Sequence, residues 1–410
     1  MNGELFPAAS PFPATREDAL AALEAFVPRA GVYAKRRNHV VAGHPHVSRL
    51  SAALRCRLIR EEEVRGAVAE RFAPSTVEKF VQEVWWRLYW KGALEMRPGQ
   101  WSDYRHALAA VPEEQRERAA RIEAGESGVA IMDHFARELV ETGYLHNHTR
   151  MWYAGFWVHT ERLPWELGAD FFLRHLLDGD AASNTLSWRW VAGLQTPGKT
   201  YLARRSNIEK YVDPDLLEGR TEGLERLERG SPNPEYADAP PRERAGPFPD
   251  SPARWSSRGQ RWGWWLHDED LSAETGELFE GSPAAVVAPF STGLWDRLGW
   301  SASRRDYLRT ALEDGATRFG DAWGVSVEQP DSGELAATLA EWARRNRLET
   351  VVAMRPFVGP LLDEIDGIRE SLRRDGVELV LLRRDGDAEI MRKATAGFFG
   401  FWKKAGPGRG

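Results

Sequence analysis

The hydrophobic pattern changes once along this chain, and that change constrains the fold more than any other feature. From about residue 15 to residue 228, apolar residues recur at intervals of three and four, as in LSAALRCRLI and VEKFVQEVWWRLYW. This spacing places apolar side chains on one face of a helix. We therefore predict that residues 1–228 form a helical domain, whose first helix is capped by Thr15 with Asp18 in its first turn.

Beyond residue 261 the pattern is different. The short apolar runs WGWWLH, AAVVAPF, WGVSVEQ, ETVVAMR and VELVLLR alternate with helical stretches such as SRRDYLRTALEDGATRF. Strands that alternate with helices predict a parallel, Rossmann-like sheet covered by helices on both faces. We therefore expect an α/β domain at 262–410, after the all-helical one. The stretch 229–261 is rich in proline, glycine, serine and charge, and is interpreted as a flexible linker.

The composition argues against a disulfide-bonded secreted protein and against a membrane-spanning one. The single cysteine, Cys56, cannot form an internal disulfide, as is typical of a reducing compartment. No apolar run approaches the roughly 18 residues of a spanning helix, and the amino end lacks the features of a signal peptide. We therefore expect a cytoplasmic protein without membrane contact, and a monomer. The net charge of −6 means that a nucleic-acid partner would need a local arginine cluster.

The stretch from Gly143 to Tyr211 carries the polar side chains that most suggest chemistry. In a helix over 146–158, Asn147, Arg150 and Met151 share one face. Asp178 and Asp180 are expected to close the next apolar helix, one turn before Asn184. An arginine against buried carboxylates is a stable arrangement, and it leaves donors for an anionic or heteroaromatic ligand. The alternative is an ion pair that only fixes two helices.

This stretch resembles the flavin-binding domain of DNA photolyases and cryptochromes. The family pattern is followed through His146, Asn147, Arg150, Met151, Trp165, Asp178, Asp180, Asn184, Trp188 and Trp190. Upstream, Tyr33 and the run SRLS at 48–51 are similar to the loop that holds the flavin phosphates, and QEVWWRLYW is similar to the helix that meets damaged DNA. The resemblance covers about 15–215. Because the family usually has its α/β domain first, this chain resembles a circularly permuted member.

The resemblance implies one non-covalently bound FAD, and leaves open a second, antenna chromophore in the α/β half. The residues it assigns to the flavin are Tyr33, Ser48, Arg49, Leu50, Ser51, Asn147, Arg150, Asp178, Asp180 and Asn184. Asn184 is the position expected beside the flavin N5, and Asp180 the one expected at its pyrimidine edge. Trp188 and Trp165 match the first two members of an electron-transfer chain, and Trp101 is the candidate for the third.

The activity implied is light-driven repair of cyclobutane pyrimidine dimers, a carbon–carbon lyase reaction in which a reduced flavin lends an electron to the dimer. Trp86 and Trp190 would sandwich the flipped bases, and Met151 favours cyclobutane dimers over the other ultraviolet photoproduct. Single-stranded DNA is a possible preference. The residues assigned to damaged DNA are Arg37, Glu83, Trp86, Arg87, Asn147, His148, Met151 and Trp190.

Two other functions are compatible with the same residues. A cryptochrome-type blue-light receptor would use the flavin to signal to a protein partner, but would not need the dimer pocket. A flavin-binding relic with neither activity is a third reading, because Leu186 and Ser187 stand where the family commonly has two glycines. The triplet His146–His148 lacks the context of a metal-binding motif, so we expect no metal site.

Overall fold

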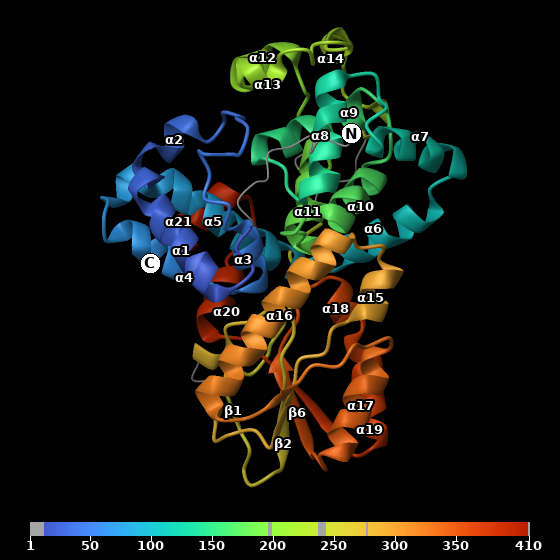
Figure 1. The fold of residues 1–410 in the computed structure, drawn as a ribbon. Coiled ribbons are helices and arrows are strands. Elements are labelled where there is room, and N and C mark those ends of the chain that lie inside the picture. The colour runs from blue at the N-terminus through green and yellow to red at the C-terminus, as the bar shows by residue number, and fades with distance from the viewer. Residues whose placement is uncertain (1–11, 196–198, 237–242, 276–277, 409–410) are drawn as a thin grey trace, which may run out of the picture.

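The computed structural model describes residues 12–195, 199–236, 243–275 and 278–408, arranged as a helical half above a half built around a parallel sheet (Figure 1). Thr15 caps the first helix as predicted, since its hydroxyl accepts a hydrogen bond from the Asp18 amide at 3.1 Å. Within the described ranges, no helix is both long enough and apolar enough to cross a lipid bilayer.

The helical half confirms the periodicity of the first 228 residues. Its core is rich in buried aromatic rings, among them those of Trp152, Trp157 and Trp188. Its helices are α1 (Arg16–Phe26), α2 (Tyr33–Arg36), α3 (Ser51–Cys56), α4 (Glu61–Ala69), α5 (Pro74–Glu95), α6 (Gly99–Ala110), α7 (Glu113–Glu123), α8 (Ala130–Thr142), α9 (Asn147–His159), α10 (Trp165–His175), α11 (Ala181–Ala192), α12 (Arg205–Tyr211), α13 (Pro214–Leu217) and α14 (Glu225–Glu228).

The second half contains a five-stranded sheet in the order β5-β4-β2-β6-β7, and every neighbouring pair is parallel. Each strand falls in one of the five predicted apolar runs: β2 (Trp262–Trp265), β4 (Ala285–Val287), β5 (Val327–Glu328), β6 (Thr350–Met354) and β7 (Glu378–Leu382). A separate pair, β1 (Trp255–Ser256) and β3 (Phe279–Glu280), was not predicted. The helices of this half are α15 (Thr292–Arg297), α16 (Ala302–Trp323), α17 (Leu335–Arg345), α18 (Pro360–Asp363), α19 (Ile365–Arg374), α20 (Asp385–Met391) and α21 (Phe398–Ala405).

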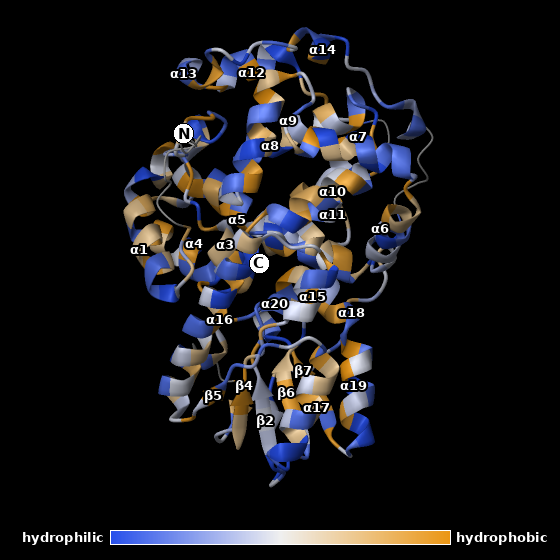
Figure 2. Cartoon of the chain, turned by 45° about the vertical axis from the view of Figure 1, so that its right-hand side comes forward, coloured by the Kyte–Doolittle hydropathy of each residue, from blue (hydrophilic) through white to orange (hydrophobic). Residues whose placement is uncertain are grey.

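Both faces of the sheet are covered by helices, as the strand–helix alternation predicted. On one face Trp264 stacks on Phe319 of α16, at 6.0 Å between ring centroids. On the other, a Cβ on Gly263 would lie 2.5 Å from the ring of Trp342 in α17, so only glycine lets this helix approach β2. In Figure 2 the strands β4 and β6 carry the orange of apolar residues, and β2 is pale.

The last two helices lie against the helical half, although the expected domain 262–410 groups them with the sheet. A Cβ on Gly92 of α5 would meet the Met391 carbonyl oxygen at 2.4 Å, so α20 packs closely there. In α21, the Ala405 carbonyl accepts from Trp85 Nε1 at 3.2 Å. Just before α21, the Ala396 carbonyl accepts from the Tyr89 hydroxyl at 2.9 Å. The two halves therefore share their packing through α5.

The described parts of the expected linker are bound to the surface rather than free, and residues 237–242 lie outside the described ranges. Arg97 Nε donates to the Glu243 carbonyl at 2.9 Å, and the Gly246 amide donates to the Met96 carbonyl at 2.9 Å. The Asn233 amide donates to His159 Nδ1 at 3.1 Å. Buried donors and acceptors of the helical half are satisfied in this way, which fixes the connection.

Candidate flavin and substrate site

The two aspartates that were expected to close a helix lie in the loop after it, and Asp180 caps the next helix. Helix α10 ends at His175, and Asp178 and Asp180 lie in the loop before α11. Asp180 is the N-cap of α11, because its Oδ1 accepts from the Ser183 amide at 2.8 Å. The sequence LLDGD places a glycine between the two acidic residues, which favours a turn, and aspartate is a preferred cap.

Arg150 of α9 and Asp178 form the expected ion pair, with Arg150 Nη2 donating to Asp178 Oδ2 at 3.1 Å. The Asp178 side chain is 5% exposed, and that of Arg150 is 23% exposed. Burial alone would raise the pKa of Asp178, but the charges of Arg150 and Arg87, with a hydrogen bond from the Ser51 side chain, outweigh it and hold that pKa below its usual value. Asp178 Oδ1 is buried, and no described residue donates a hydrogen bond to it. One acceptor of this carboxylate is thus available to a ligand.

Asp180 is surrounded by donors of the protein itself. Its Oδ2 accepts from Arg87 Nη1 at 3.4 Å and lies 3.6 Å from Lys91 Nζ, both on α5. Arg87 Nη2 also donates to the Ser51 carbonyl at 3.2 Å, so one guanidinium joins α3, α5 and the loop before α11. The Arg87 side chain is 12% exposed. Arg87 therefore connects elements inside the protein, and this position does not suit the DNA contact assigned to it.

The serine-rich loop before α3 lies next to this cluster through Ser51. Arg49 adopts a left-handed backbone conformation, with φ +56°, and its guanidinium lies 5.6 Å from the ring of Phe12. Ser48 Oγ accepts from the Leu50 amide at 3.4 Å. The Leu50 side chain is 1% exposed and belongs to the core, so only its backbone can face a ligand.

Tyr33 of α2, another residue assigned to the flavin, packs with its ring edge on Phe80 at 5.2 Å. Burial, followed by the negative charge of Glu83, raises the pKa of its phenol. The hydroxyl therefore stays protonated at neutral pH and can act as a donor.

Asn184 lies in the first turn of α11 and is 8% exposed. Its side-chain Nδ2 donates to the Ala169 carbonyl of α10 at 2.7 Å. The bond is to a neighbouring helix, and not to the backbone of its own helix end. This bond fixes the orientation of the amide and leaves Oδ1 as the group that can accept from a ligand.

Three of the predicted residues, Asn147, His148 and Met151, lie near the start of α9 and differ in their accessibility and contacts. Asn147 is exposed and Met151 is half-buried, so both are accessible from outside. His148 hydrogen-bonds through Nδ1 to the Asn38 carbonyl at 2.9 Å, and its ring lies 4.1 Å from that of Trp152. His148 therefore fixes the 37–40 loop on α9 and is not free for a DNA contact.

Glu83 and Arg37 form an ion pair, with both side chains half-buried. Burial raises the pKa of Glu83, and Arg37 only partly offsets this effect. Trp86, one turn further along α5, stacks on Phe398 of α21 with centroids 3.8 Å apart and planes at 8°. Trp190 packs instead on Tyr201 at 5.7 Å. No ring contact joins Trp86 to Trp190.

The three tryptophans of the expected electron-transfer chain do not form one direct series of ring contacts. Trp188 packs on Phe172 at 5.0 Å and on Trp157 at 6.3 Å. It also lies against Gly168, where a Cβ would come within 2.3 Å of its ring. Gly168 is one turn along α10 from Trp165.

Tyr104 of α6 lies between the other two tryptophans, 5.4 Å from Trp165 and 5.3 Å from Trp101. This tyrosine was not predicted. The spacing of three residues between Trp101 and Tyr104, which places both rings on one helix face, is the signal that could have identified it.

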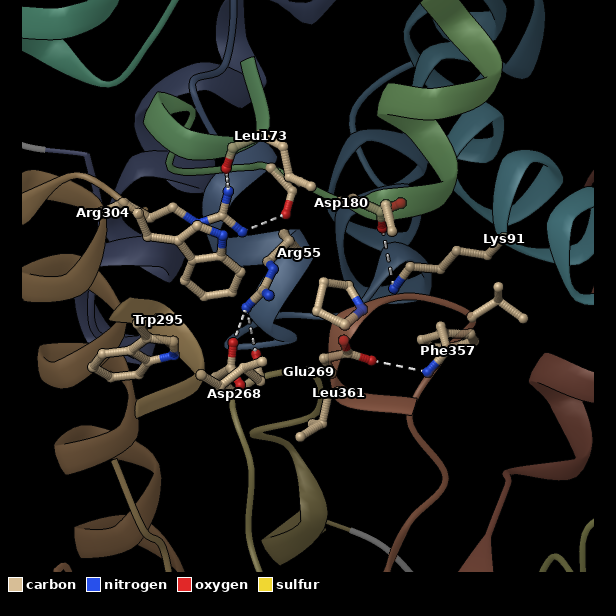
Figure 3. A pocket seen from close by; sticks show the side chains of 16 residues that line it. Arg55, Lys91, Leu173, Asp180, Asp268, Glu269, Trp295, Arg304, Phe357 and Leu361 are labelled. Carbon is tan, nitrogen blue, oxygen red and sulfur yellow. Dashed lines mark hydrogen bonds and ion pairs between the residues drawn. The ribbon is translucent and has the colours of Figure 1, made fainter. Parts of the chain in front are cut away.

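A pocket lies where the carboxyl ends of β2, β4 and β6 meet the helical half (Figure 3). Four of its charged side chains form ion pairs, Arg55 with Asp268 and Lys91 with Asp180, and Glu269 accepts from the Phe357 amide at 2.8 Å. Arg304 donates to the carbonyls of Leu173 and Gly179, the latter at 2.8 Å. The pocket is therefore part of the seam between the halves, and an antenna chromophore stays a prediction.

Two further residues that were not predicted, Lys91 and His44, contact the elements around the site. Lys91 is 3% exposed, and its Nζ lies 4.0 Å from the ring of Phe357 in the sheet half. His44 Nε2 lies 2.8 Å from Glu138 Oε1, which ties the serine-rich loop to α8. Among the described residues, no group of three or more histidine, cysteine or acidic side chains is arranged to hold a metal ion.

Part of the chain, which includes α9 and α11, is similar to known proteins. Residues 80–215 match the family profile described as the FAD binding domain of DNA photolyase. A deoxyribodipyrimidine photo-lyase of Streptomyces griseus is 32% identical over 218 residues, which is 47% of this chain and 44% of the relative. A putative mitochondrial cryptochrome DASH of Neurospora crassa is 39% identical over 83 residues, covering 20% of this chain and 11% of the relative.

A solved structure, that of a bacterial class III photolyase from Agrobacterium tumefaciens, aligns with a TM-score of 0.44 at 23% identity. The alignment covers 55% of this chain and 58% of that one. The chain spans less than half the length of the curated relatives that it matches. The FAD-binding region of this chain is similar to that of the DNA photolyase/cryptochrome family and precedes the parallel sheet, an order consistent with circular permutation.

Proposed function

We propose that this protein repairs cyclobutane pyrimidine dimers in DNA, using light and a bound FAD. The observation that carries the proposal is the convergence of Ser51, Arg87 and Asp180 from three separate parts of the chain. Through Arg87, the serine-rich loop and the loop before α11 are held side by side. These are the two segments that would bind opposite ends of a flavin dinucleotide.

The residues present fit that cofactor. Asp178 Oδ1 is a buried acceptor without a described partner, and so suits an N–H group of the isoalloxazine ring. Because the Asp180 oxygens already accept from Ser183 and Arg87 and are ion-paired with Lys91, Asp178 is the better candidate for this contact. Arg49, with the hydroxyls of Ser48 and Ser51, would hold the pyrophosphate. When bound, the flavin would supply light-driven one-electron chemistry.

The substrate side of the proposal rests on the side chains that remain accessible. Phe398 stacks on one face of Trp86 and holds its ring in a fixed orientation, and the ring of Trp90 lies 5.0 Å away at 34°. Trp86 is half-buried, so a base would contact the part of its ring that stays accessible. Asn147 and Met151 on α9, with Glu83 on α5, would line the pocket. Glu83, paired with Arg37, would accept hydrogen bonds from the polar edge of a pyrimidine. Arg37 is the candidate phosphate contact, while Arg87 and His148 are not part of this proposal.

The test uses the purified full-length protein. It should show the absorption spectrum of a bound flavin, or take up FAD on reconstitution. Under blue light it should remove the dimer from oligonucleotides carrying one thymine dimer, and darkness should abolish the reaction. Single-stranded and duplex substrates compared in parallel would establish the preference. Full flavin occupancy without light-dependent loss of dimers would overturn repair in favour of the photoreceptor, and a protein that cannot bind flavin would overturn both.

Replacing Asp178 by alanine should release flavin and lower the free energy of unfolding by about 2–3 kcal/mol, because Arg150 loses its partner. The loss is at the lower end for a buried ion pair since Arg150 is partly exposed. Asp178→Asn is the matched control, which keeps an oxygen acceptor and the side-chain volume but removes the charge. Flavin content and urea unfolding measure the two effects. Retention of both cofactor and stability in the alanine variant would show that this pair is misassigned.

A further inference from the structure

Three buried aromatic rings form a continuous series from α10 through α6 to the sheet half. Trp165, Tyr104 and Trp101 are each 2% exposed, and successive centroids are 5.4 and 5.3 Å apart. The interplanar angles of 33° and 39° keep the neighbouring rings close to offset stacking. Rings in this proximity couple well enough for an electron to pass along them.

The series ends on a proton acceptor from the other half of the chain. Trp101 Nε1 donates to Oδ2 of Asp363, the last residue of α18, at 2.9 Å. Arg105 Nη1 donates to the same oxygen at 3.1 Å. Burial raises the pKa of Asp363, although the bonds to Trp101 and Arg105 partly offset this, and a raised pKa makes the carboxylate a stronger base. The Asp363 side chain is 41% exposed, so a proton taken up there can leave to water.

We next consider the oxidised states of Tyr104 and Trp165, the two other rings of the series. The hydroxyl of Tyr104 is buried, and no described residue accepts a hydrogen bond from it. Oxidised tyrosine is stabilised chiefly by losing its hydroxyl proton, which this environment does not permit. The guanidinium of Arg189 lies 5.8 Å from the Trp165 ring and that of Arg105 lies 5.9 Å from the Trp101 ring, so positive charge disfavours a cation on either indole. What distinguishes Trp101 is the carboxylate on its Nε1, which can take its proton.

We propose that Trp101 is the final electron donor of this series and that Asp363 accepts its indole proton, with the ring of Tyr104 acting as the bridge from Trp165. In the balanced step the photoexcited flavin is the oxidant. Trp101 loses one electron toward it and one proton from Nε1 to Asp363 Oδ2, which leaves a neutral indole radical and a protonated carboxyl group. The acidity of an oxidised indole and the 2.9 Å separation suit this transfer. The inference rests on the proposed flavin function.

Asp363→Asn is the main test, because it keeps the size of the side chain and removes the base. In the flavin-loaded protein, transient absorption after a laser flash should show a neutral tryptophan radical in the wild type. In the variant the radical should persist in its protonated, cationic form and recombine about tenfold faster. Asp366→Asn, at a 97% exposed side chain three residues away, is the control and should behave as the wild type. A neutral radical formed equally fast in Asp363→Asn would overturn the role of Asp363.

Two substitutions of Tyr104 test the bridge. Tyr104→Phe keeps the ring without the hydroxyl, and should leave the yield of the Trp101 radical within about twofold of the wild type. Tyr104→Leu removes the ring, and should lower that yield at least tenfold. Unfolding of both variants by urea separates a loss of coupling from a loss of structure. Equal yields in the leucine and phenylalanine variants would overturn the bridge.

A readout without flavin separates this inference from the proposed function. In the flavin-free protein labelled with ¹⁵N-tryptophan, the indole N–H resonance of Trp101, assigned with Trp101→Phe, should move on Asp363→Asn and exchange faster with water. An unmoved resonance would overturn the contact. Failure to bind flavin would instead overturn the proposed function and leave this resonance shift intact.

Discussion

Replacing Trp188 by phenylalanine should slow light-driven reduction of the bound flavin by on the order of a hundredfold or more, a change of about 2.7 kcal/mol in activation free energy. The indole of Trp188 is 2% exposed and lies directly on α10 through Gly168, one turn from Trp165. Phenylalanine fills most of the same volume, but its ring is far harder to oxidise. The measurement is the rate of bleaching of the oxidised flavin band under constant blue light with an external thiol.

The matched control for this variant is Trp157→Phe. Trp157 is fully buried, packs on Trp188 at 6.3 Å and would undergo the same change in size within the same core. It is not one of the tryptophans assigned to the route, so its replacement should leave the rate within about twofold while lowering stability by a similar amount. Equal slowing in both variants would indicate a packing effect, and unchanged photoreduction in Trp188→Phe would remove Trp188 from the route.

Local pattern was enough to predict most of the fold. The three-and-four spacing identified the helical half, and the five apolar runs each contain one strand of the sheet. The pair β1 and β3 was missed because Trp255 lies inside a proline-rich stretch, where a two-residue strand has no periodicity to detect. The packing of α21 on α5 was also missed, since the stacking of Trp86 on Phe398 joins residues that are distant in sequence.

In the candidate site, too, some contacts were predicted from the sequence and others depend on tertiary packing. The ion pair between Arg150 and Asp178 was predicted because a family pattern places both residues. The internal position of Arg87 was not, because its surroundings are set by Ser51 and Asp180 on other elements. Asp363 could not have been found from sequence, since nothing within its own helix distinguishes it from other acidic residues. The sequence motif thus identifies candidate site residues, but tertiary packing determines which of them contact each other.

Replacing Glu95 by alanine should lower the free energy of unfolding by about 3–5 kcal/mol, which is the largest stability effect expected in this protein. Glu95 ends α5, and its side chain is fully buried at the seam between the halves. Its Oε2 accepts from Arg355 at 2.7 Å and from Arg383 at 2.8 Å, and its Oε1 accepts from the Val358 amide at 2.8 Å. Without the carboxylate, the 3% exposed guanidinium of Arg383 would remain buried without a counter-charge.

The variant Glu95→Gln distinguishes the contribution of the Glu95 charge to stability from that of its hydrogen bonds. The amide oxygen can still accept from Val358, so this variant should lose less stability than Glu95→Ala while still leaving both arginines without an anion. Glu370→Ala removes the exposed ion pair with Arg373 and should cost less than about 1 kcal/mol. Urea unfolding followed by tryptophan fluorescence measures all three variants. If Glu95→Ala were no more destabilising than Glu370→Ala, the ion pairs of Glu95 could not be what joins the sheet half to α5.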